Sequence, residues 1–358
     1  MRLQNQNVLF FAKAMGLGGS ENVVLQLCEV FKPIVNRVVV CSGGGVNEEK
    51  LKKLGVRHYT IGDIENKTPN NILHVMKELK RIVSDEKITV IHTHHRMAAF
   101  YVEATGMYKY CCFINTSHNT FYNKRFFTRL SYKNANLIAC GEMVKKNLLE
   151  YFGLEKVTTI RNAVKPFCDQ IVVDEVFQKS KRNGGFIVVN IGRLSEQKGM
   201  EYFIRAIPEI TKKHPETDFY IIGTGEDEEE LKALSIEINA KVTFLGYRSD
   251  IQNLLSQVDL VVLSSLWEGL PLTPIEAFSV GKTIVATGVD GTCEIVKDMK
   301  NGLLISPRDV DGIANKVCWM IENPEEKKKM EISAKATFDN EFSFNVFAEA
   351  YKKYYEGL

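Results

Sequence analysis

Two glutamates, Glu268 and Glu276, follow a short apolar run and are separated by seven residues. The run, residues 259–265, is typical of a buried strand in a parallel sheet. Glu268 precedes the expected turn and Glu276 lies in the first turn of the following helix, so both should face the carboxyl end of the sheet. Open α/β folds bind their ligands at this edge. The two carboxylates therefore form a candidate ligand site.

The same residues also have a purely structural explanation. Thr273 can cap a helix that has Pro274 at its first position, and Thr273-x-x-Glu276 then matches a capping box. Glu268 could be an ordinary surface acid. Residues elsewhere in the chain have to decide between the two explanations.

A loop with two cations follows another apolar run, residues 186–191. Arg193 and Lys198 lie in this loop, before a helix that should begin near Met200. The planar guanidinium of arginine can donate two parallel hydrogen bonds, and the ammonium group of lysine is a compact positive charge. Together they suit a diphosphate group. The alternative is a solvated loop whose cations bind nothing.

A glycine-rich loop with Gly18 and Gly19 follows the first expected strand. Small residues before a helix let the backbone approach a phosphate, although a plain turn is the alternative. The dinucleotide fingerprint is not matched, because Glu21 occupies the place of its third glycine. Since such loops open both halves of the chain, we expect a ligand held in a cleft between two domains.

Three histidines, His92, His94 and His95, end the expected strand at residues 89–95. A His-x-His-His run can indicate a metal. No cysteine or carboxylate pattern completes such a site, so we expect no metal. We interpret His94 and His95 as structural residues or as contacts to a ligand at the cleft edge, with Arg96 beside them.

The elements that position these residues alternate between strand and helix in both halves of the chain. This pattern predicts an α/β protein with two Rossmann-like, doubly wound domains and parallel sheets. We expect an N-terminal domain at 1–165, a C-terminal domain at 166–340, and a last helix at 341–358 that packs back on the N-terminal domain. The irregular, charged stretch 167–185 marks the boundary. Expected strands are 8–11, 37–41, 56–61, 89–95, 111–115, 135–139 and 157–160, then 186–191, 218–222, 242–245, 260–264 and 283–286.

Composition restricts the partners and the compartment. The 358 residues carry a formal net charge of +2, so no overall field indicates nucleic acid. No apolar run approaches the length of a membrane span, and the first residues lack the apolar region of a signal peptide. The eight cysteines show no CxxC spacing. We therefore expect a cytoplasmic protein.

One stretch, residues 121–133, mixes aromatic and basic side chains. Arg125, Arg129 and Lys133 are predicted to share one helical face. Such a face could touch an anionic membrane at the inner surface of the cell, as a peripheral contact. The alternative is a helix with a solvated basic face.

Taken together, four features resemble the retaining glycosyltransferases of family 4, which have the GT-B fold. They are the loop Gly18-Gly19-Ser20-Glu21, the histidine of Ser117-His118-Asn119, Gly192-Arg193-Leu194-x-x-x-Lys198-Gly199, and Glu268-x7-Glu276. They occur in the expected order and cover most of the chain. The last two are specific in combination, and the glycine loop and the histidine are individually weak.

The resemblance implies roles for the residues that match. Arg193 and Lys198 would grip the donor diphosphate, Glu276 would accept hydrogen bonds from the ribose, and Glu268 would bind the donor sugar. His118 would lie near the transferred sugar. His94 and His95 would be acceptor-side or structural residues, and Arg96 a further contact to the acceptor. Further donor contacts are implied for Gly18, Gly19, Gly223, Gly225, Gly246, Tyr247, Gly269, Leu270, Leu272 and Thr273, with the base held at Gly246 and Tyr247.

The implied activity is transfer of a sugar, with retention, from a nucleotide-diphosphate sugar to a hydroxyl group. We expect a UDP-sugar as donor and a glycan or lipid-linked saccharide as acceptor, in cell-surface polysaccharide synthesis. No cofactor or metal is expected, because the two cations would replace it. Two alternatives remain open, a sugar-nucleotide epimerase and a non-catalytic protein that binds nucleotide sugars.

Overall fold

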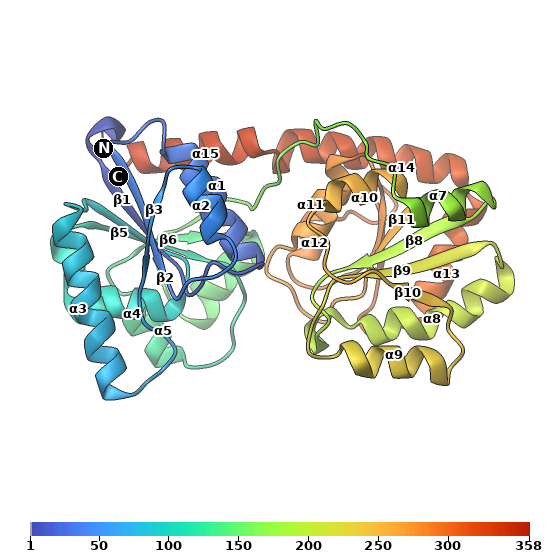
Figure 1. Cartoon of the computed structure of the whole chain (residues 1–358), viewed down its shortest axis with the longest axis horizontal. Helices are drawn as coiled ribbons and strands as arrows, with labels where there is room; N and C mark the ends of the chain where they lie inside the picture. Colours follow the sequence, from blue (N-terminus) through green and yellow to red (C-terminus); the bar gives the residue numbers. More distant parts are fainter. Residues whose placement is uncertain (1) are drawn as a thin grey trace. The chain divides into compact units, whose positions relative to one another are not determined.

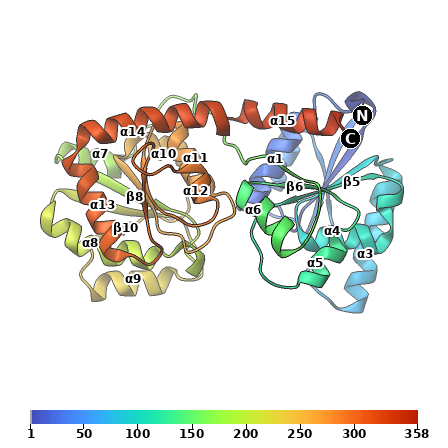
Figure 2. The same ribbon diagram turned by 180° about the vertical axis from the view of Figure 1, so that it is seen from behind.

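The computed structural model describes residues 2–358 and divides the chain into two units. The first comprises the chain up to Asn162 together with Phe344–Leu358, and the second is Ala163–Ser343 (Figure 1). Each unit is built on one parallel sheet with helices on both faces, as Figure 2 shows from behind. The predicted fold class, two doubly wound Rossmann-like units, is confirmed.

The first unit has a seven-stranded sheet in the order β3-β2-β1-β4-β5-β6-β7. Helices α1 and α15 lie on one face, and α3, α4 and α5 lie on the other. Its strands are β1 Asn7–Phe11, β2 Arg37–Ser42, β3 Arg57–Thr60, β4 Val90–Thr93, β5 Cys112–Ser117, β6 Asn136–Ala139 and β7 Val157–Thr159. Its helices of five residues or more are α1 Gly19–Phe31, α2 Glu48–Lys53, α3 Pro69–Asp85, α4 Arg96–Thr105, α5 Arg125–Ser131, α6 Glu142–Lys146, the π-helical turn η3 Asn147–Tyr151, and α15 Phe344–Glu356.

Helix α15 completes the core of the first unit from the far end of the sequence. Its Tyr351 and Tyr355 are buried, and the Tyr355 ring lies 4.2 Å, centroid to centroid, from the ring of Phe31 on α1. The Tyr355 hydroxyl also forms a hydrogen bond of 2.7 Å with Nδ1 of His92 on β4. These two aromatic side chains of the helix are therefore part of the core of the first unit.

The second unit has a six-stranded sheet in the order β10-β9-β8-β11-β12-β13. Its strands are β8 Phe186–Ile191, β9 Thr217–Ile222, β10 Val242–Phe244, β11 Leu260–Leu263, β12 Ile284–Thr287 and β13 Leu303–Ile305. Its helices are α7 Glu175–Arg182, η4 Glu196–Lys198, α8 Met200–Lys213, α9 Glu228–Glu237, α10 Ile251–Gln257, α11 Leu272–Ser279, α12 Thr292–Ile295, α13 Val310–Glu322, α14 Pro324–Thr337 and the π-helical turn η5 Phe338–Phe342.

The central strands of the second sheet, β8 and β11, are almost wholly apolar and buried, as strands covered on both faces must be. One face packs on α8 and α13, which supply Phe203, Ile207 and Val317 to a continuous core. Because these strands end at the same edge of the sheet, the loops that follow them lie side by side.

The start of α11 differs from the prediction. The helix begins at Leu272 with Pro271 at its N-cap, and no side chain caps it. The hydroxyl of Thr273 donates instead to the carbonyl of Ile191, at 3.4 Å. The capping box that would have explained Glu276 is therefore wrong, because the helix starts two residues earlier than Pro274.

Two further expectations are corrected. The stretch 167–185 is not irregular throughout, because α7 forms within it and is capped by Asp174. Helix α5 ends at Ser131, so Lys133 lies beyond it and does not share a helical face with Arg125 and Arg129.

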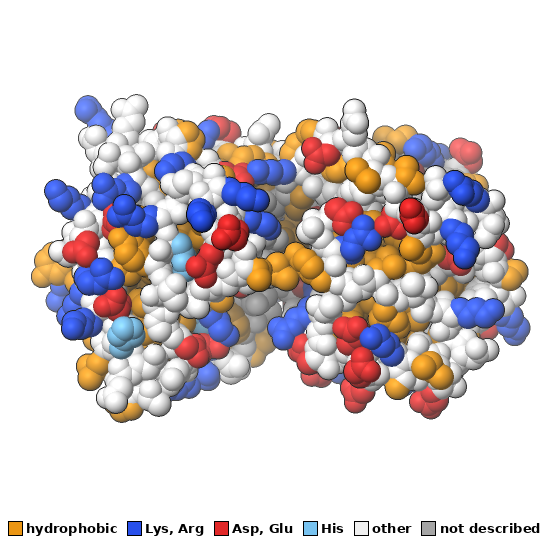
Figure 3. Space-filling view, viewed as in Figure 1, with side chains coloured by type: hydrophobic (Ala, Val, Ile, Leu, Met, Phe, Trp, Pro, Cys, Tyr) orange, Lys and Arg blue, Asp and Glu red, His pale blue; other side chains and the backbone are white. Residues whose placement is uncertain are grey.

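Charge is dispersed over the surface. Figure 3 shows lysine and arginine side chains interspersed with aspartate and glutamate on the face that it displays. Within residues 2–358, no helix is both long and apolar enough to cross a membrane.

Candidate functional site

The loops at the carboxyl end of the second sheet pack backbone against backbone. A Cβ on Gly223 would overlap the carbonyl of Gly192, and one on Gly225 would overlap the carbonyl of Leu194. Gly223 also has a φ of +141°, which side chains disfavour. The Leu194 N–H donates to the Thr224 carbonyl at 3.0 Å. Glycine is thus required here so that the loops after β8 and β9 can touch.

The loops after β11 and β12 approach in the same way. A Cβ on Gly291 would overlap the carbonyl of Gly269. The backbone N–H of Glu268 donates to Oδ2 of Asp290 at 3.3 Å. Burial raises the pKa of Asp290, and the nearby Glu268 charge adds to this rise. Asp290 was missed by the sequence analysis, although its position after a predicted strand was a usable signal.

An ion pair between Lys198 and Glu268 joins the two central strand ends. Nζ of Lys198 lies 2.5 Å from Oε1 of Glu268, and their side chains are only 17% and 6% exposed. The Ser265 hydroxyl donates to the same oxygen at 2.7 Å. The Ser264 hydroxyl donates to the Lys198 carbonyl at 3.0 Å, which fixes the loop that carries the lysine. The structure therefore brings together two residues that the sequence placed in one site.

Glu276 lies on α11 beyond its first turn, contrary to the prediction that it lies in the first turn, because the helix begins at Leu272; its side chain is half-buried. Within residues 2–358, its carboxyl group has no hydrogen-bond partner. Burial raises the pKa of Glu276 to about 7, and the positive charge of Lys198 opposes that rise. A carboxyl group near Lys198 with unfilled acceptor positions can bind hydroxyl groups of a ligand.

Arg193 behaves differently from Lys198. Its side chain is 71% exposed, and its Nε lies 3.0 Å from the Glu226 carboxylate. It makes this surface ion pair rather than one with Glu268. The run of acids at 226–230 lies at the beginning of α9.

The other predicted donor residues also lie on these loops. Gly246 follows β10 with a φ of +67°, and its carbonyl accepts a hydrogen bond of 2.8 Å from the Gly223 N–H. Tyr247 is 49% exposed. Leu270 and Thr273 are buried, and Leu272 is half-buried. The loops after β8, β9 and β10 are thus joined to one another by backbone contacts.

In the first unit, the ends of β4 and β5 bring His94 and His118 together. Nδ1 of His94 lies 3.0 Å from Nε2 of His118, and the rings are stacked at 5.3 Å. His92 bonds the hydroxyls of Thr116 and Tyr355 instead. Burial lowers the pKa of His118 to about 4 and the pKa values of His92 and His94 well below their usual range. These rings are neutral hydrogen-bonding groups at neutral pH.

The other two predicted acceptor-side residues begin α4. His95 is its N-cap, and its Nδ1 accepts from the Met97 N–H at 3.2 Å. Arg96 lies over the Phe121 ring at 5.0 Å and donates to the Thr128 hydroxyl at 2.9 Å. In the described part of the chain, no group of histidines, cysteines and acids could hold a metal ion.

The predicted phosphate cradle at Gly18 and Gly19 is occupied by a side chain. Gly18 is the N-cap of α1, and the carboxylate of Glu21 lies against it. The Ser20 hydroxyl donates to this carboxylate at 2.7 Å. A phosphate at this helix end would have to displace the Glu21 carboxylate.

Comparison with known proteins matches this geometry. Residues 172–337 match the model of glycosyl transferases group 1, and residues 17–166 match that of glycosyltransferase family 4. The fold and these matches define a glycosyltransferase of the GT-B type. The chain belongs to glycosyltransferase family 4, which confirms the resemblance drawn from the sequence.

Curated relatives include glycosyltransferases of different specificities. An Escherichia coli UDP-Gal:alpha-D-GlcNAc-diphosphoundecaprenol alpha-1,3-galactosyltransferase is 29% identical over 275 residues, which cover 68% of this chain and 70% of that protein. Glycogen synthase of Mycobacterium tuberculosis is 27% identical over 62% of this chain, and the chain spans 53% of its length.

Among solved structures, a glycosyltransferase from Rickettsia africae has a TM-score of 0.85 and 20% identity, with 99% of this chain and 98% of that chain covered. Anabaena HepE in complex with UDP-glucose has a TM-score of 0.83 and 19% identity, with 99% and 100% covered. At these identities the likeness shows the fold alone.

The buried histidines predict that acid destabilises the first unit. Below about pH 6.5 the unfolded chain gains protons that native His94 and His118 do not, so the free energy of unfolding should fall until these histidines are protonated in the native state, near pH 4 for His118. The slope is about 1.4 kcal/mol per pH unit for each histidine. Urea denaturation from pH 8 to pH 4.5 measures this slope. The double variant His94→Gln/His118→Gln should show a shallower slope, and the exposed control His74→Gln should not; equal slopes would contradict the assignment.

Proposed function

We propose that the chain is a retaining glycosyltransferase that uses a UDP-sugar as donor. The observation that carries the proposal is the buried Lys198–Glu268 ion pair with the unpartnered Glu276 carboxyl group nearby. A buried ion pair is weak evidence for stability, because desolvation costs offset its Coulombic attraction. A ligand-binding role accounts for the pair and for Glu276 together.

The roles follow from charge and position. Lys198 binds the donor diphosphate, Glu268 accepts hydrogen bonds from the donor sugar, and Glu276 accepts them from the ribose. Without donor, Glu268 neutralises Lys198 at 2.5 Å. Arg193 would leave its exposed pair with Glu226 to join Lys198, at little cost, since exposed pairs contribute about 0–1 kcal/mol.

The uridine donor and the acceptor are supported by the relatives. The Escherichia coli relative is named for UDP-Gal and for a sugar-diphosphoundecaprenol acceptor, and Anabaena HepE was solved with UDP-glucose. We infer a glycan or lipid-linked saccharide acceptor, in the assembly of a cell-surface polysaccharide.

The proposed chemistry needs no carboxylate nucleophile, because both glutamates bind the donor. The bond between the anomeric carbon and the β-phosphate oxygen breaks as the acceptor oxygen bonds to the same face of that carbon. The departing phosphate takes the acceptor proton. Lys198 and Arg193 stabilise the charge on this phosphate, so no metal is required. For His118 we keep the role that the resemblance implies, a neutral hydrogen-bonding group for the transferred sugar.

The test is an assay of UDP-sugars with saccharide acceptors, in the presence of a chelator. NMR of the product should show the same anomeric configuration as the donor. An inverted product, or loss of activity that added metal restores, would overturn the corresponding part of the proposal. Donor isomerised without acceptor would indicate an epimerase, and tight binding without turnover would indicate a non-catalytic binding protein.

Lys198→Ala should remove most turnover. Negative charge concentrates on the β-phosphate in the transition state, so a cation aimed there acts on kcat as well as KM. The loss should be about 3–4 kcal/mol, on the order of a hundred-fold or more in rate. Calorimetry should show weaker binding of UDP but little change for UMP, which lacks the β-phosphate.

Two controls accompany this variant. Because it leaves Glu268 buried without its cation, melting must be recorded beside kcat, and Lys198→Gln keeps a hydrogen-bond donor there. Lys212→Ala on α8 is the exposed control. Full turnover in Lys198→Ala, or equal loss of UDP and UMP affinity, would refute the diphosphate assignment.

Glu276→Gln should lower UDP affinity without lowering stability. No capping function is lost. Because the pKa of Glu276 is raised from 4.5 to about 7 on folding, stability is lost as the pH rises between these values and the loss is complete at pH 8, so the variant should melt there at the same or a higher temperature. Loss of charged hydrogen bonds to the ribose should weaken UDP roughly ten- to a hundred-fold. Pyrophosphate, which has no ribose, is the matched ligand and should bind unchanged.

The pH dependence gives a second measure of Glu276. In the unsubstituted protein, UDP affinity relative to pyrophosphate should fall as pH drops below about 7, because the carboxyl group becomes protonated. The Gln variant should lose this dependence. Unchanged UDP affinity would return Glu276 to a structural role.

We also propose that the first unit binds an anionic membrane through residues 122–133. Three large apolar side chains are exposed in this stretch, Tyr122 at 67%, Phe126 at 82% and Leu130 at 44%. No acidic residue occurs between Thr120 and Ala135. The exposed basic residues are Lys124, Arg125, Arg129 and Lys133. Apolar side chains that enter the interface beside cations are typical of peripheral membrane binding.

Vesicle sedimentation tests the membrane proposal. The protein should sediment with vesicles of phosphatidylglycerol at low salt and be released at high salt, whereas phosphatidylcholine vesicles should not bind it. Arg125→Glu/Arg129→Glu/Lys133→Glu should abolish sedimentation. The control is Lys50→Glu/Lys52→Glu/Lys53→Glu near α2, which changes the net charge equally. Equal binding by both triple variants would reject this surface.

A further inference from the structure

The loop between β10 and α10 is anchored at its first residue. The Gly246 carbonyl accepts from the Gly223 N–H at 2.8 Å, and the Leu245 N–H donates to the Ile221 carbonyl at 2.9 Å. Tyr247, the next residue, is half exposed, and within residues 2–358 its side chain forms no hydrogen bond. The shape of this loop must therefore be fixed from its other end.

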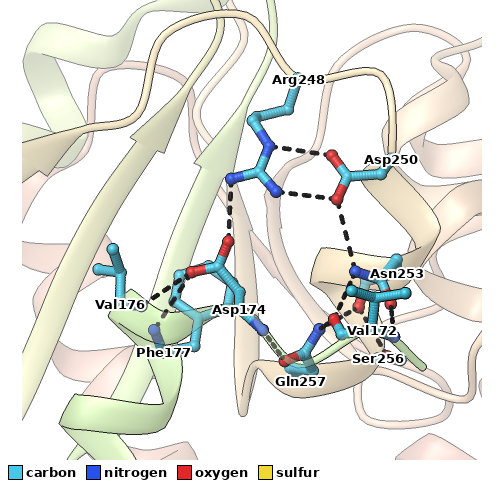
Figure 4. Close-up of polar contacts among 9 residues, drawn as sticks. All are labelled: Val172, Asp174, Val176, Phe177, Arg248, Asp250, Asn253, Ser256 and Gln257. Atoms are coloured by element: carbon cyan, nitrogen blue, oxygen red, sulfur yellow. Dashed lines mark hydrogen bonds and ion pairs between the residues drawn. The ribbon is translucent and has the colours of Figure 1, made fainter.

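Arg248 anchors that other end with three hydrogen bonds (Figure 4). Its Nε and one terminal nitrogen donate to the two carboxylate oxygens of Asp250, at 2.9 and 2.8 Å. The remaining terminal nitrogen donates to Oδ2 of Asp174 at 2.9 Å. The hydrogen bond from Arg248 holds the pKa of Asp250 below its usual range. Only a planar guanidinium can make this fork and reach a third oxygen as well.

The second anchor, Asp174, is itself fixed. Its other carboxylate oxygen accepts from the backbone N–H groups of Val176 and Phe177 at the start of α7, at 3.0 and 3.4 Å. Its own N–H donates to the side chain of Gln257 on α10 at 2.9 Å. The side chain of Asp174 is only 9% exposed. Arg248 is therefore bonded to a carboxylate whose position is fixed by other hydrogen bonds.

Helix α10 closes the network. The amide side chain of Asn253 accepts from the Val172 N–H at 2.8 Å and donates to the Val172 carbonyl at 2.9 Å. Segment 172–174 is therefore bonded to α10, which begins after Asp250. Arg248 bonds to Asp250 and also to Asp174, and this second bond closes the cycle, as Figure 4 shows. A closed cycle of this kind restricts the backbone of the loop at residues 246–249.

We propose that Arg248 is a positioning residue that sets the choice of nucleobase through this loop. The inference rests on the proposed function together with the role that the family resemblance implies for Gly246 and Tyr247, which is to hold the donor base through their backbone. A base is recognised by its pattern of donors and acceptors, and uracil carries a carbonyl acceptor where adenine carries an amino donor. A rigid backbone offers one pattern and rejects the other, because a mismatched base leaves polar groups unpaired. Arg248 does not touch the ligand in this arrangement.

The experiment compares three ligands, UDP, ADP and pyrophosphate, by calorimetry on the full chain. Arg248→Gln and Arg248→Lys should each weaken UDP about ten-fold, leave pyrophosphate unchanged, and bring the ratio of UDP to ADP affinity toward one. The control is Arg205→Gln on α8, where the arginine is 45% exposed with one long ion pair to Glu201. Hydrogen exchange of the amides at residues 247–249 should become faster in the Arg248 variants only.

Asp174→Asn is the second variant, for the case in which Arg248→Gln fails to fold. It keeps an oxygen to cap α7 but weakens the anchor of Arg248, so the ratio of UDP to ADP affinity should fall in the same direction by a smaller amount. An unchanged ratio, or an equal loss for all three ligands, would overturn the inference while the proposed function stands. A parent protein that binds no nucleoside diphosphate would overturn both.

Discussion

The second unit depends on the contact between Lys198 and Glu268 at the ends of its two central strands. The two side chains are only 17% and 6% exposed, and removing one partner of a buried pair typically costs about 3–5 kcal/mol. Residues of the adjoining loops support that contact. Ser264 and Ser265 hold its two sides, Asp290 holds the Glu268 backbone, and glycines allow the neighbouring loops to close around it.

Glycines at this edge are required for close backbone approach as well as for their backbone angles. Gly225 and Gly291 have ordinary backbone angles, yet a methyl group on either would overlap a carbonyl of the adjacent loop. Side chains are therefore excluded from the places where loops meet, and backbone groups line the sheet edge. Such an edge suits a ligand that is rich in oxygen atoms, because peptide N–H groups can reach it without intervening side chains.

The sequence predicted the α/β architecture well, because parallel strands buried on both faces give continuous apolar runs, as residues 260–264 do. It also placed Lys198 and Glu268 in one site, since both follow central strands. The predicted ends of two helices were wrong. Thr273 matched a capping box, but α11 begins earlier, at Leu272, with Pro271 as its N-cap. Lys133 fitted the helical pattern of residues 125–133, but α5 ends at Ser131. Asp290 follows a predicted strand and could have been a candidate on that ground, but its bond with Glu268 and the anchoring role of Arg248 depend on contacts between distant segments, which local patterns do not contain.

The return of helix α15 to the first unit has a consequence for the order of synthesis. The first sheet is complete by residue 159, but Tyr351 and Tyr355, which bond Thr116 and His92, follow nearly two hundred residues later in the sequence. On the ribosome, the whole of Ala163–Ser343 emerges before these two residues do. The second unit is a continuous segment and can close while the first still exposes part of its core, a state in which chains are prone to aggregate. A chain truncated between the two segments, after Ser343 and before Tyr351, would therefore have one finished unit and one open one.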